Sequence, residues 1–480
     1  MVMNEYSLLE LETIFNNFIN DFNLERSTDT IWLYPKDIRF DYLPSQGFKL
    51  HISATIINCI DIAQIVLPYF HEYNIPYKII SSIEELLMLN RGLYGYSQIG
   101  KFITVYPEDP GMAINLSTIL DQRTKVFSGP KIPSDKPCFP QSLIFYRYGE
   151  IRGNEENRKI PKNHLVMPNG SLVEDTRSSG LAVPDWVINP FEKYEENSID
   201  QLPKNYVVIE VLRKRGKGGV YRVIDLSTDD KKVKILKEGL FQGEVEVTGT
   251  DARTRLQWEV KLLDKLSKSN NIFPHVYETF YMNDNFYVVM EDKGHKSLKQ
   301  LVKENKNFEI KDILNLMITI TEQLVKLHAD GIILRDLSLD NIVLNDKGEC
   351  FVIDLEFAYK KTEGPPLIAV GTPGFCPKRI YSLKQTVVPP DLSHDIYAIG
   401  SMIHILIMPS KYMEFLELSL DSVIDKKIIL EAWNRGVLPP FIPSKLKNLI
   451  SKSTSEDHEY RYHNTETFLS DLIDIRKELV

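Results

Sequence analysis

The feature that most restricts the fold of this 480-residue chain is a set of polar residues in a fixed order in its second half. The stretch "ILRDLSLDNIVL" contains Arg335, Asp336 and Asn341 in an R-D-x4-N spacing, and "FVIDLEFA" then contains Asp354. Any one of these matches can arise by chance. The ordered set is specific, because each added member has to fall at its own place in the chain.

Two further elements precede this set. The stretch "GKGGVYRV" lies between two predicted strands, where glycines let the backbone approach phosphate groups closely. Lys237 ends the predicted strand "KVKILK" and can reach these phosphates as a point charge. Glu259, on the predicted helix "RTRLQWEVKLLDKL", can hold this lysine in place. The glycines concerned are Gly216, Gly218 and Gly219.

Phosphoryl transfer requires these groups. It needs a lysine on the nucleotide, Mg²⁺ held by an aspartate and an asparagine, and an aspartate that orients the attacking hydroxyl. We therefore assign Lys237, Glu259 and the three glycines to nucleotide binding. Asn341 and Asp354 are the predicted metal ligands, and Asp336 is the predicted catalytic residue. The set predicts a two-lobed protein-kinase-like fold that uses ATP or GTP together with Mg²⁺.

Three departures distinguish this set from that of an ordinary signalling kinase. Leu334 stands where a histidine is usual, and Ser338 stands where protein kinases commonly carry a lysine. Asp354 is followed by Leu-Glu rather than Phe-Gly. The metal and base positions are nevertheless all filled, which favours an active kinase over a degenerate, non-catalytic one.

Charge and cysteine content exclude several classes of protein. The formal net charge is −9 and no block of like charges forms a tail, so neither a nucleic acid nor an anionic membrane is indicated as a partner. The four cysteines are far apart and lack C-x-x-C spacing, which argues against a zinc site and a disulfide framework. No apolar run approaches the ~20 residues of a membrane span. We expect a cytoplasmic protein.

The polar, proline-containing stretch "YEENSIDQLPKNY" reads as a linker between two domains, residues 1–195 and 205–480. The first domain mixes short predicted strands such as "KFITVYP" with helices such as "CIDIAQIVLPYFHEY", an α+β pattern. In its strand "GFKLHISAT", apolar residues alternate with Lys49, His51 and Ser53. The lysine and the histidine therefore point the same way, either into solvent or into a pocket.

The motifs "RDLSLDN", "VIDLEFA" and "GTPGF" resemble the kinase domain of class III and class IV lanthipeptide synthetases. The stretches "GFKLHISAT", "GKFITVYP", "LIFYRYG" and "LAVPDWVINPF" resemble the phosphoserine/phosphothreonine lyase domain of the same enzymes. The resemblance implies a ribosomally made precursor peptide as partner, with a leader and a core that contains Ser, Thr and Cys. Such synthetases usually continue into a cyclase domain, so we expect either a truncated chain or a separately encoded cyclase.

The resemblance also implies a reaction in two steps. The kinase phosphorylates Ser or Thr, and the lyase eliminates the phosphate to give dehydroalanine or dehydrobutyrine. Elimination needs a base, an acid for the leaving group and cations for the phosphate. By resemblance Lys49 is the base, His51 is the acid, and Lys78 lies near the phosphate or the developing enolate. A lysine among other cations has its pKa lowered towards the neutral amine that a base requires.

Four further cations are candidates for phosphate binding. Arginine side chains can bind a phosphate with two parallel hydrogen bonds, but each can equally form a structural ion pair. The candidates are Arg123 in "LDQRT", Arg147 in "FYRYG", Arg177 in "EDTRSSG" and Lys101 in "GKFITVYP".

Two other functions remain open at this stage. One is a regulatory Ser/Thr protein kinase whose first domain only senses or docks a ligand, and the other is a non-catalytic scaffold. The K-x-H strand separates the two-step enzyme from the regulatory kinase, and the intact kinase set separates both from the scaffold. The polar stretch "EGLFQGEVEVTGTDARTR", at 238–255, is longer than a connection needs, and we expect it to contact the leader.

Overall fold

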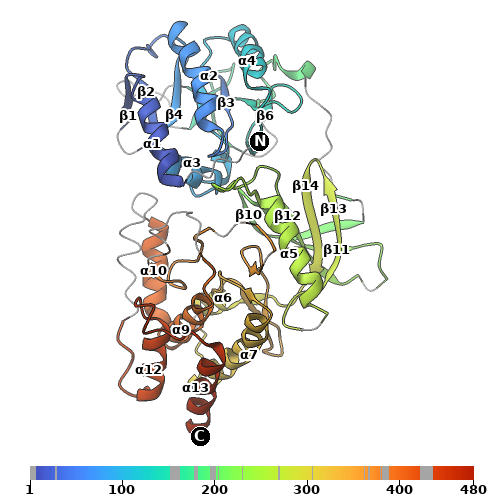
Figure 1. Ribbon diagram of the computed structural model, residues 1–480. Helices are drawn as coiled ribbons and strands as arrows, with labels where there is room; N and C mark the ends of the chain where they lie inside the picture. The colour runs from blue at the N-terminus through green and yellow to red at the C-terminus, as the bar shows by residue number, and fades with distance from the viewer. Residues whose placement is uncertain are drawn as a thin grey trace.

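The computed structural model describes two domains and a short connection between them. In Figure 1 the N-terminal domain lies at the top, and the sheet and the helical lobe of the second domain lie below it. Both α+β architectures predicted from the sequence are confirmed. The residues described are 7–27, 30–151, 163–177, 182–194, 202–203, 205–229, 231–268, 271–304, 306–361, 363–365, 368–378, 380, 389–421 and 436–479.

The N-terminal domain is built on a seven-stranded antiparallel sheet with the order β1-β2-β4-β5-β3-β7-β6. Its strands are β1 (Leu24–Arg26), β2 (Trp32–Pro35), β3 (Gln46–Ile52), β4 (Tyr77–Ile80), β5 (Ile103–Val105), β6 (Lys136–Pro137) and β7 (Ile144–Glu150). The helices are α1 (Leu8–Ile19), α2 (Cys59–Glu72), α3 (Ile83–Asn90) and α4 (Pro110–Thr124). A hairpin of β8 (His164–Val166) and β9 (Leu172–Glu174) and the short 3-10 turns η1 (Tyr96–Gln98) and η2 (Glu192–Tyr194) complete it.

One face of this sheet forms the core of the domain. Phe48, Leu50 and Ile52 alternate along β3 and are buried against apolar residues of α1 to α4. Since successive side chains of a strand point to opposite faces, Lys49 and His51 must lie on the other face. The apolar packing of β3 therefore decides where its polar residues go.

The second domain begins with a five-stranded antiparallel sheet, ordered β10-β11-β12-β14-β13, and one helix. These elements are β10 (Tyr206–Arg215), β11 (Gly218–Asp225), β12 (Val233–Gly239), α5 (Ala252–Leu266), β13 (Val276–Met282) and β14 (Asn285–Glu291). The helical lobe that follows contains α6 (Leu298–Lys303), α7 (Ile310–Ala329), α9 (Ser393–Ile407), α10 (Pro409–Asp421), α12 (Ser444–Ser453) and α13 (Thr465–Glu478). Its small sheets are formed by β15 (Lys296–Ser297), β17 (Ile342–Leu344) and β18 (Cys350–Val352), and by β16 (Ile332–Ile333) and β19 (Tyr359–Lys360).

The two domains are in contact. Val247 and Ile368, both from the second domain, belong to the buried core of the first and are 7% and 2% exposed. A Cβ on Gly216, in the glycine-rich turn, would lie only 1.6 Å from the carbonyl oxygen of Asn90 at the end of α3. The first domain therefore packs against three separate segments of the second.

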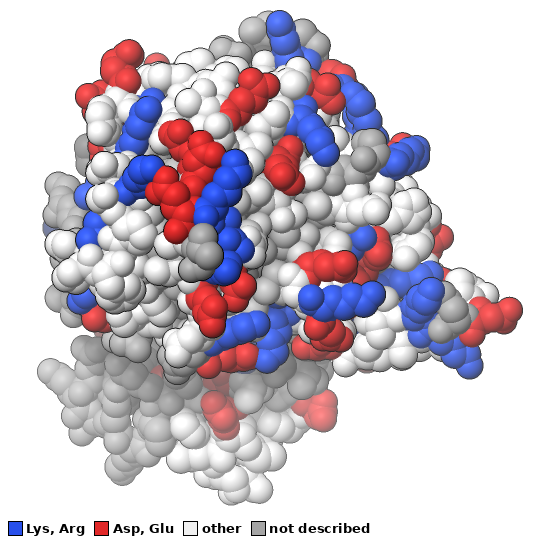
Figure 2. Space-filling view, turned by 90° about the horizontal axis from the view of Figure 1, so that it is seen from below, with Lys and Arg blue, Asp and Glu red and all other residues white. Residues whose placement is uncertain are grey.

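The surface seen from below carries both signs of charge. Figure 2 shows lysine and arginine side chains interspersed with aspartate and glutamate side chains over this face. Among the described residues, no helix has both the length and the apolar character needed to cross a lipid bilayer.

A glycine fixes the packing of α9, which is buried along most of its length. A Cβ on Gly400 would lie 2.0 Å from Ser453 Oγ and 2.8 Å from Ser453 Cβ on α12. We expect Gly400→Ala to force these helices apart and to destabilise the lobe by about 1–3 kcal/mol, the usual cost of overpacking. This loss exceeds the gain in helix propensity of up to about 1 kcal/mol. The midpoint of thermal unfolding measures it.

The matched control is Gly111→Ala in the first turn of α4. There the nearest atom is the Asp109 carboxylate at 3.2 Å, and Gly111 is exposed, so we expect no loss. Equal midpoints for Gly400→Ala and the wild type would refute the close packing of α9 on α12.

Candidate active sites

The strand register of the N-terminal domain places the predicted lyase residues on one face. Lys49 on β3 lies opposite Arg147 on β7. His51 lies opposite Thr104 on β5, which in turn lies opposite Lys78 on β4. Residues directly opposite each other in an antiparallel sheet share a face, so these side chains form a row across four strands.

Most of this face is buried, and Lys49 and Lys78 are half-buried on it. His51 and Lys101 are both 4% exposed and Arg147 is 3% exposed. Burial, reinforced by Arg147, lowers the pKa of Lys49 to about 7. Burial, reinforced by Lys49, lowers the pKa of Lys78 to about 7 as well. The pKa of Lys101 falls to about 8, again chiefly through burial. Two amines are therefore available as bases near neutral pH.

Two buried carboxylates balance part of this charge. Asp135 Oδ2 lies 2.5 Å from His51 Nδ1, and Asp135 Oδ1 lies 3.3 Å from Lys101 Nζ. Asp175 Oδ1 lies 2.5 Å from a guanidinium nitrogen of Arg147. Burial alone would raise the pKa of Asp135, but His51 and Lys101 outweigh it and hold that pKa below its usual range.

The ionised Asp135 determines the state of His51. A carboxylate can only accept, so Nδ1 of His51 carries the proton and its other ring nitrogen, Nε2, is left for a ligand. Burial lowers the pKa of His51 to about 3 even though Asp135 opposes the shift, so the ring is neutral at pH 7 in this state.

The remaining predicted cations are placed differently. Lys78 Nζ lies 4.2 Å from the centroid of the Trp32 ring, at the β4 side of the row. Arg177 is exposed but contributes to the lowered pKa values of Lys49 and Lys78, so it lies near the row. Arg123 is exposed on α4 and stacks 4.4 Å from the Tyr69 ring centroid on α2. The structure therefore does not bring Arg123 into the row.

Sequence reasoning missed both carboxylates. Asp135 and Asp175 lie outside the helices and strands, in "IPSDKP" and "VEDTR", where no periodicity indicates what they face. Asp175 stands two residues before the candidate Arg177, which was the one available signal.

The predicted kinase residues also meet in one place. Lys237 Nζ lies 2.6 Å from Glu259 on α5 and 3.2 Å from Asp354. Burial opposes a charged lysine, but Asp354 and Glu259 outweigh it and hold the pKa of Lys237 above its usual value. The strand, the helix and the segment after β18 are thereby tied together by one ammonium group.

Asp336 and Asn341 lie between β16 and β17. The side-chain NH₂ group of Asn341 donates to the Asp336 backbone carbonyl at 2.8 Å. This bond leaves the side-chain oxygen of Asn341, Oδ1, available as a ligand for a cation. Thr372 donates from its amide and its hydroxyl to Asp336 Oδ1, at 2.9 and 2.8 Å. Burial raises the pKa of Asp336 to about 6, so it is ionised at neutral pH.

The oxygen donors of Asp354 and Asn341 fit Mg²⁺, a hard cation that is usually held by one or two protein ligands and by substrate phosphates. Within the described ranges, no cluster of three or more His, Cys, Asp or Glu side chains could hold a metal by itself. A magnesium ion here would therefore depend on nucleotide phosphates for the rest of its coordination.

The glycine-rich turn contacts the carboxylates of Asp354 and Glu356 through Lys217. Lys217 forms an ion pair with Glu356 and lies 3.7 Å from Asp354. Gly218 has a φ of +132°, and a Cβ there would lie 2.1 Å from the Glu238 carbonyl oxygen. Gly216, a predicted nucleotide-binding residue, lacks room for a side chain because of the domain contact with Asn90.

The departures from the usual kinase set have structural counterparts. Leu334 is buried, and its amide donates to Asp395 Oδ2 at 2.8 Å. Nε2 of His328 donates to the same carboxylate at 2.9 Å, so His328 has a structural role in holding this segment. Ser338 is 1% exposed, which leaves no space for a lysine at that position.

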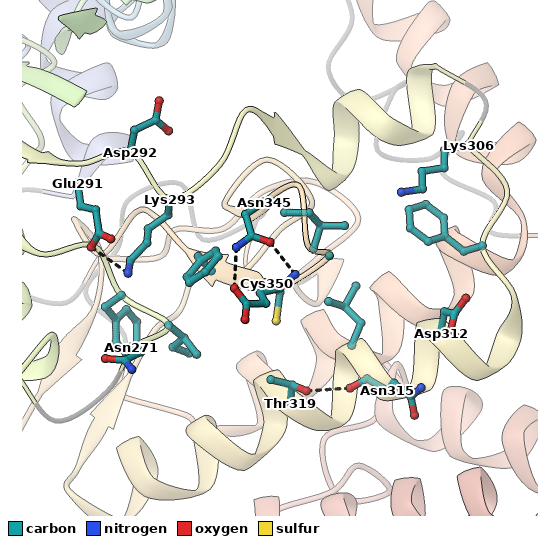
Figure 3. Close-up of a pocket in the computed structure, with 18 of the residues that line it drawn as sticks. Asn271, Glu291, Asp292, Lys293, Lys306, Asp312, Asn315, Thr319, Asn345 and Cys350 are labelled. Atoms are coloured by element: carbon teal, nitrogen blue, oxygen red, sulfur yellow. Dashed lines mark hydrogen bonds and ion pairs between the residues drawn. The ribbon is translucent and has the colours of Figure 1, made fainter. Parts of the chain in front are cut away.

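A groove of the second domain, about 1180 Å³ in volume, is lined by none of the predicted site residues. It lies beside the end of β14, and Figure 3 shows several of its polar side chains bonded to one another rather than pointing into the groove. Lys293 pairs with Glu291 at 2.8 Å, and Thr319 donates to the Asn315 carbonyl at 3.0 Å. The predicted site residues therefore lie elsewhere in the molecule.

Comparison with known families agrees with this geometry. Residues 209–472 match the family described as "Protein kinase domain", which covers more than half of the chain. The chain therefore belongs to the protein kinase family, and a kinase domain implies ATP and Mg²⁺. Residues 17–201 match a second family, "RamC, N-terminal domain".

Individual relatives point the same way. The chain is 27% identical over 80% of its length to the probable SapB synthase of Streptomyces coelicolor. It is 24% identical over 58% of its length to a probable serine/threonine-protein kinase of Clostridium acetobutylicum, and 26% identical over 56% to serine/threonine-protein kinase C of Synechocystis sp.. It spans 41%, 41% and 48% of these three relatives. The order of the two domains and the similarity to SapB synthase confirm the resemblance identified from the sequence motifs.

We expect Asp135→Asn to destabilise the N-terminal domain by about 3–5 kcal/mol, because it leaves the buried Lys101 without its counter-charge and weakens the hydrogen bond that Nδ1 of His51 donates. Urea unfolding monitored by circular dichroism measures the loss. The control is Asp41→Asn, whose carboxylate forms an exposed pair with Arg39 and should contribute about 0–1 kcal/mol. Similar losses for both variants would contradict the role of Asp135.

The lowered pKa values of Lys49 and Lys78 predict how anions bind. Sulfate stays a dianion between about pH 6 and pH 9, so a change in its affinity reports the charge of the protein. As the pH falls through about 7 both amines gain a proton, and we expect sulfate to bind on the order of tenfold more tightly per charge gained. Calorimetric titration measures this change.

The control is the double variant Lys49→Met/Lys78→Met, which should show a much flatter dependence. A wild-type affinity that stays constant over this range would mean that both lysines keep their ordinary pKa of 10.5.

Proposed function

We propose that this chain dehydrates Ser and Thr residues of a ribosomally made precursor peptide, as in lanthipeptide biosynthesis. The kinase domain, which we place at residues 205–480, phosphorylates the hydroxyl. The N-terminal domain, residues 1–195, eliminates the phosphate to give dehydroalanine or dehydrobutyrine. The observation that carries the proposal is the buried row of cations with two amines of lowered pKa, in the same chain as a filled kinase site.

In the first step the kinase residues position the reactants. Lys237, fixed by Glu259, holds the nucleotide phosphates, and the ionised Asp336 orients the substrate hydroxyl and accepts its proton. When held by Asp354 and Asn341, Mg²⁺ would neutralise the charge that develops on the transferred group. ATP is the nucleotide that the kinase domain implies, and GTP is an alternative donor.

In the second step the Cα–H and Cβ–O bonds break and a Cα=Cβ double bond forms. A neutral lysine takes the Cα proton and becomes an ammonium ion, and the Cβ–O electron pair leaves with the phosphate. Lys49 is our candidate base, and Lys78, with its similarly lowered pKa, is the second candidate. Arg147 and Lys101 are our candidates for balancing the charge of the phosphate.

The leaving phosphate needs a proton, which we assign to Nε2 of His51. This nitrogen faces away from Asp135, but the ring is neutral at pH 7 in the absence of a phosphate. A phosphate dianion beside the ring favours the imidazolium form, because a nearby opposite charge raises the pKa of a histidine. Binding of the substrate phosphate would therefore raise the pKa of His51, so that the ring takes up a proton from solvent. Nε2 then donates this proton to the leaving phosphate.

The test is a mass spectrum of a candidate precursor peptide after incubation with the full chain, ATP and Mg²⁺. Loss of one water per modified residue supports the proposal. Gain of phosphate alone would point to the regulatory kinase, and an unchanged peptide would point to a scaffold. A separately encoded cyclase, if one exists, would act on the dehydrated product without changing its mass.

Two variants separate the steps. Asp354→Asn removes a metal ligand, so we expect phosphorylation to be abolished and elimination from a pre-phosphorylated peptide to be retained. Lys49→Ala removes the base, so we expect phosphopeptide to accumulate, with elimination slowed by about 10²–10⁴-fold. Both rates are obtained by counting phosphates by mass.

Lys78→Ala, run in parallel, decides which lysine is the base. Normal elimination by both lysine variants would remove the lyase assignment. The exposed variant Lys268→Ala, whose lysine pairs with Asp264 on the surface, is the matched control and should behave like the wild type.

A further inference from the structure

The segment between β12 and α5 carries a buried glutamate that no catalytic assignment explains. Glu246 is 5% exposed, and its Oε1 lies 3.0 Å from a guanidinium nitrogen of Arg255. Burial raises the pKa of Glu246 to about 7, and Arg255 is the strongest of the cations that oppose this shift. An isolated carboxylate would not stay ionised there, so its charge depends on its neighbours.

Three arginines from three parts of the chain act on this carboxylate. Arg255 lies on α5, one turn before Glu259, which holds the nucleotide lysine. Arg335 directly precedes the catalytic Asp336, and Arg91 ends α3 in the N-terminal domain. Like Arg255, both arginines lower the pKa of Glu246 and so favour its ionised form.

Arg335 connects the catalytic segment to the residues that follow Asp354. Its backbone has a φ of +70°, and its side chain donates to the carbonyl oxygens of Phe357, at 3.3 Å, and Ile368. Arg255 in turn lies 3.8 Å from Glu356. Arg255 and Arg335 thus each contact the chain that follows Asp354, and both favour the ionised form of Glu246.

In many protein kinases this task belongs to a phosphorylated residue. Phosphorylation orders the activation segment through new arginine–phosphate pairs, and activity requires both the lysine–glutamate pair on the helix and the metal-binding aspartate to be in place. A carboxylate of the chain itself can supply the same negative charge as long as neighbouring arginines keep it ionised.

We propose that Glu246 is a positioning residue of the kinase. It acts through Arg255 and Arg335 as a built-in anion, in place of a phosphorylated activation segment. The neighbouring Val247 is buried in the core of the N-terminal domain, which anchors the segment of Glu246, and the charge of Arg91 from that domain favours the ionised carboxylate.

This role also bears on the expected leader contact of residues 238–255. Several side chains of that stretch, including Val245, Glu246 and Arg255, are buried within the protein. A leader could contact only the residues of the stretch that remain exposed.

The proposal rests on the kinase activity of the proposed function and not on the elimination step. The test uses the full chain with ATP and Mg²⁺ and measures the phosphorylation of a synthetic Ser/Thr peptide, and ATP hydrolysis without peptide. Rates are divided by the number of ADP-binding sites obtained by calorimetry, so unfolded protein does not count. We expect Glu246→Gln to lower kcat by roughly 10²-fold with little change in the KM for ATP, the size of effect that misplaced reacting groups produce.

Rescue and charge controls sharpen the result. Glu246→Asp keeps the charge and should recover most of the rate, whereas Arg91→Gln should lower kcat less than Glu246→Gln does. The matched control is Glu210→Gln, which removes an exposed partner of Arg222 on β10 and should leave kcat unchanged. Wild-type protein treated with a phosphatase should keep its full kcat.

A wild-type kcat for Glu246→Gln, equal losses for the Asp and Gln variants, or loss of activity after phosphatase treatment would each overturn the proposal. If the wild type turns over ATP but never dehydrates a peptide, the proposed function fails. The ratio of the kcat values of Glu246→Gln and the wild type still decides the role of Glu246.

Discussion

A charged side chain removed from water has to meet an opposite charge, and this constraint shapes both domains and their contact. In the N-terminal domain Asp135 and Asp175 hold part of the cationic row in place. In the kinase domain Lys237 joins Glu259 to Asp354. Each site is therefore an arrangement of pairs in which one ion fixes the position of several others.

The carboxylates of the N-terminal site balance only part of the cationic row, and the remaining amines are suited to acid–base chemistry. Lys49 and Lys78 are half-buried and lie among other cations, so their pKa values fall to about 7. A structural ion pair would have had the opposite effect and kept both amines protonated. The sheet face thus combines ion pairs that orient the site with amines of lowered pKa that can accept a proton.

The sequence was informative where local spacing carries the signal. Alternation along β3 predicted that Lys49 and His51 share a face, and the ordered kinase residues predicted the two-lobed domain and the contact of Lys237 with Glu259. It was uninformative where a residue is defined only by what it meets in space. Asp135, from an irregular segment, meets a strand far away in the chain, and neither a periodicity nor a motif marks it. The stacking of Arg123 on Tyr69 likewise depends on how α2 and α4 pack.

Asn90 shows how closely the two halves of the molecule are connected. Its backbone oxygen faces Gly216 in the glycine-rich turn, while its side chain donates to the Ala54 carbonyl after β3 and accepts from the Gly100 amide beside Lys101. The spacing between the two candidate sites is set by this contact rather than by the connecting chain. For a peptide that stays attached while it visits both sites, the second encounter is intramolecular, with an effective concentration on the order of millimolar for a short flexible tether. A modified residue would then reach the second site far more often than it would after release into bulk solution.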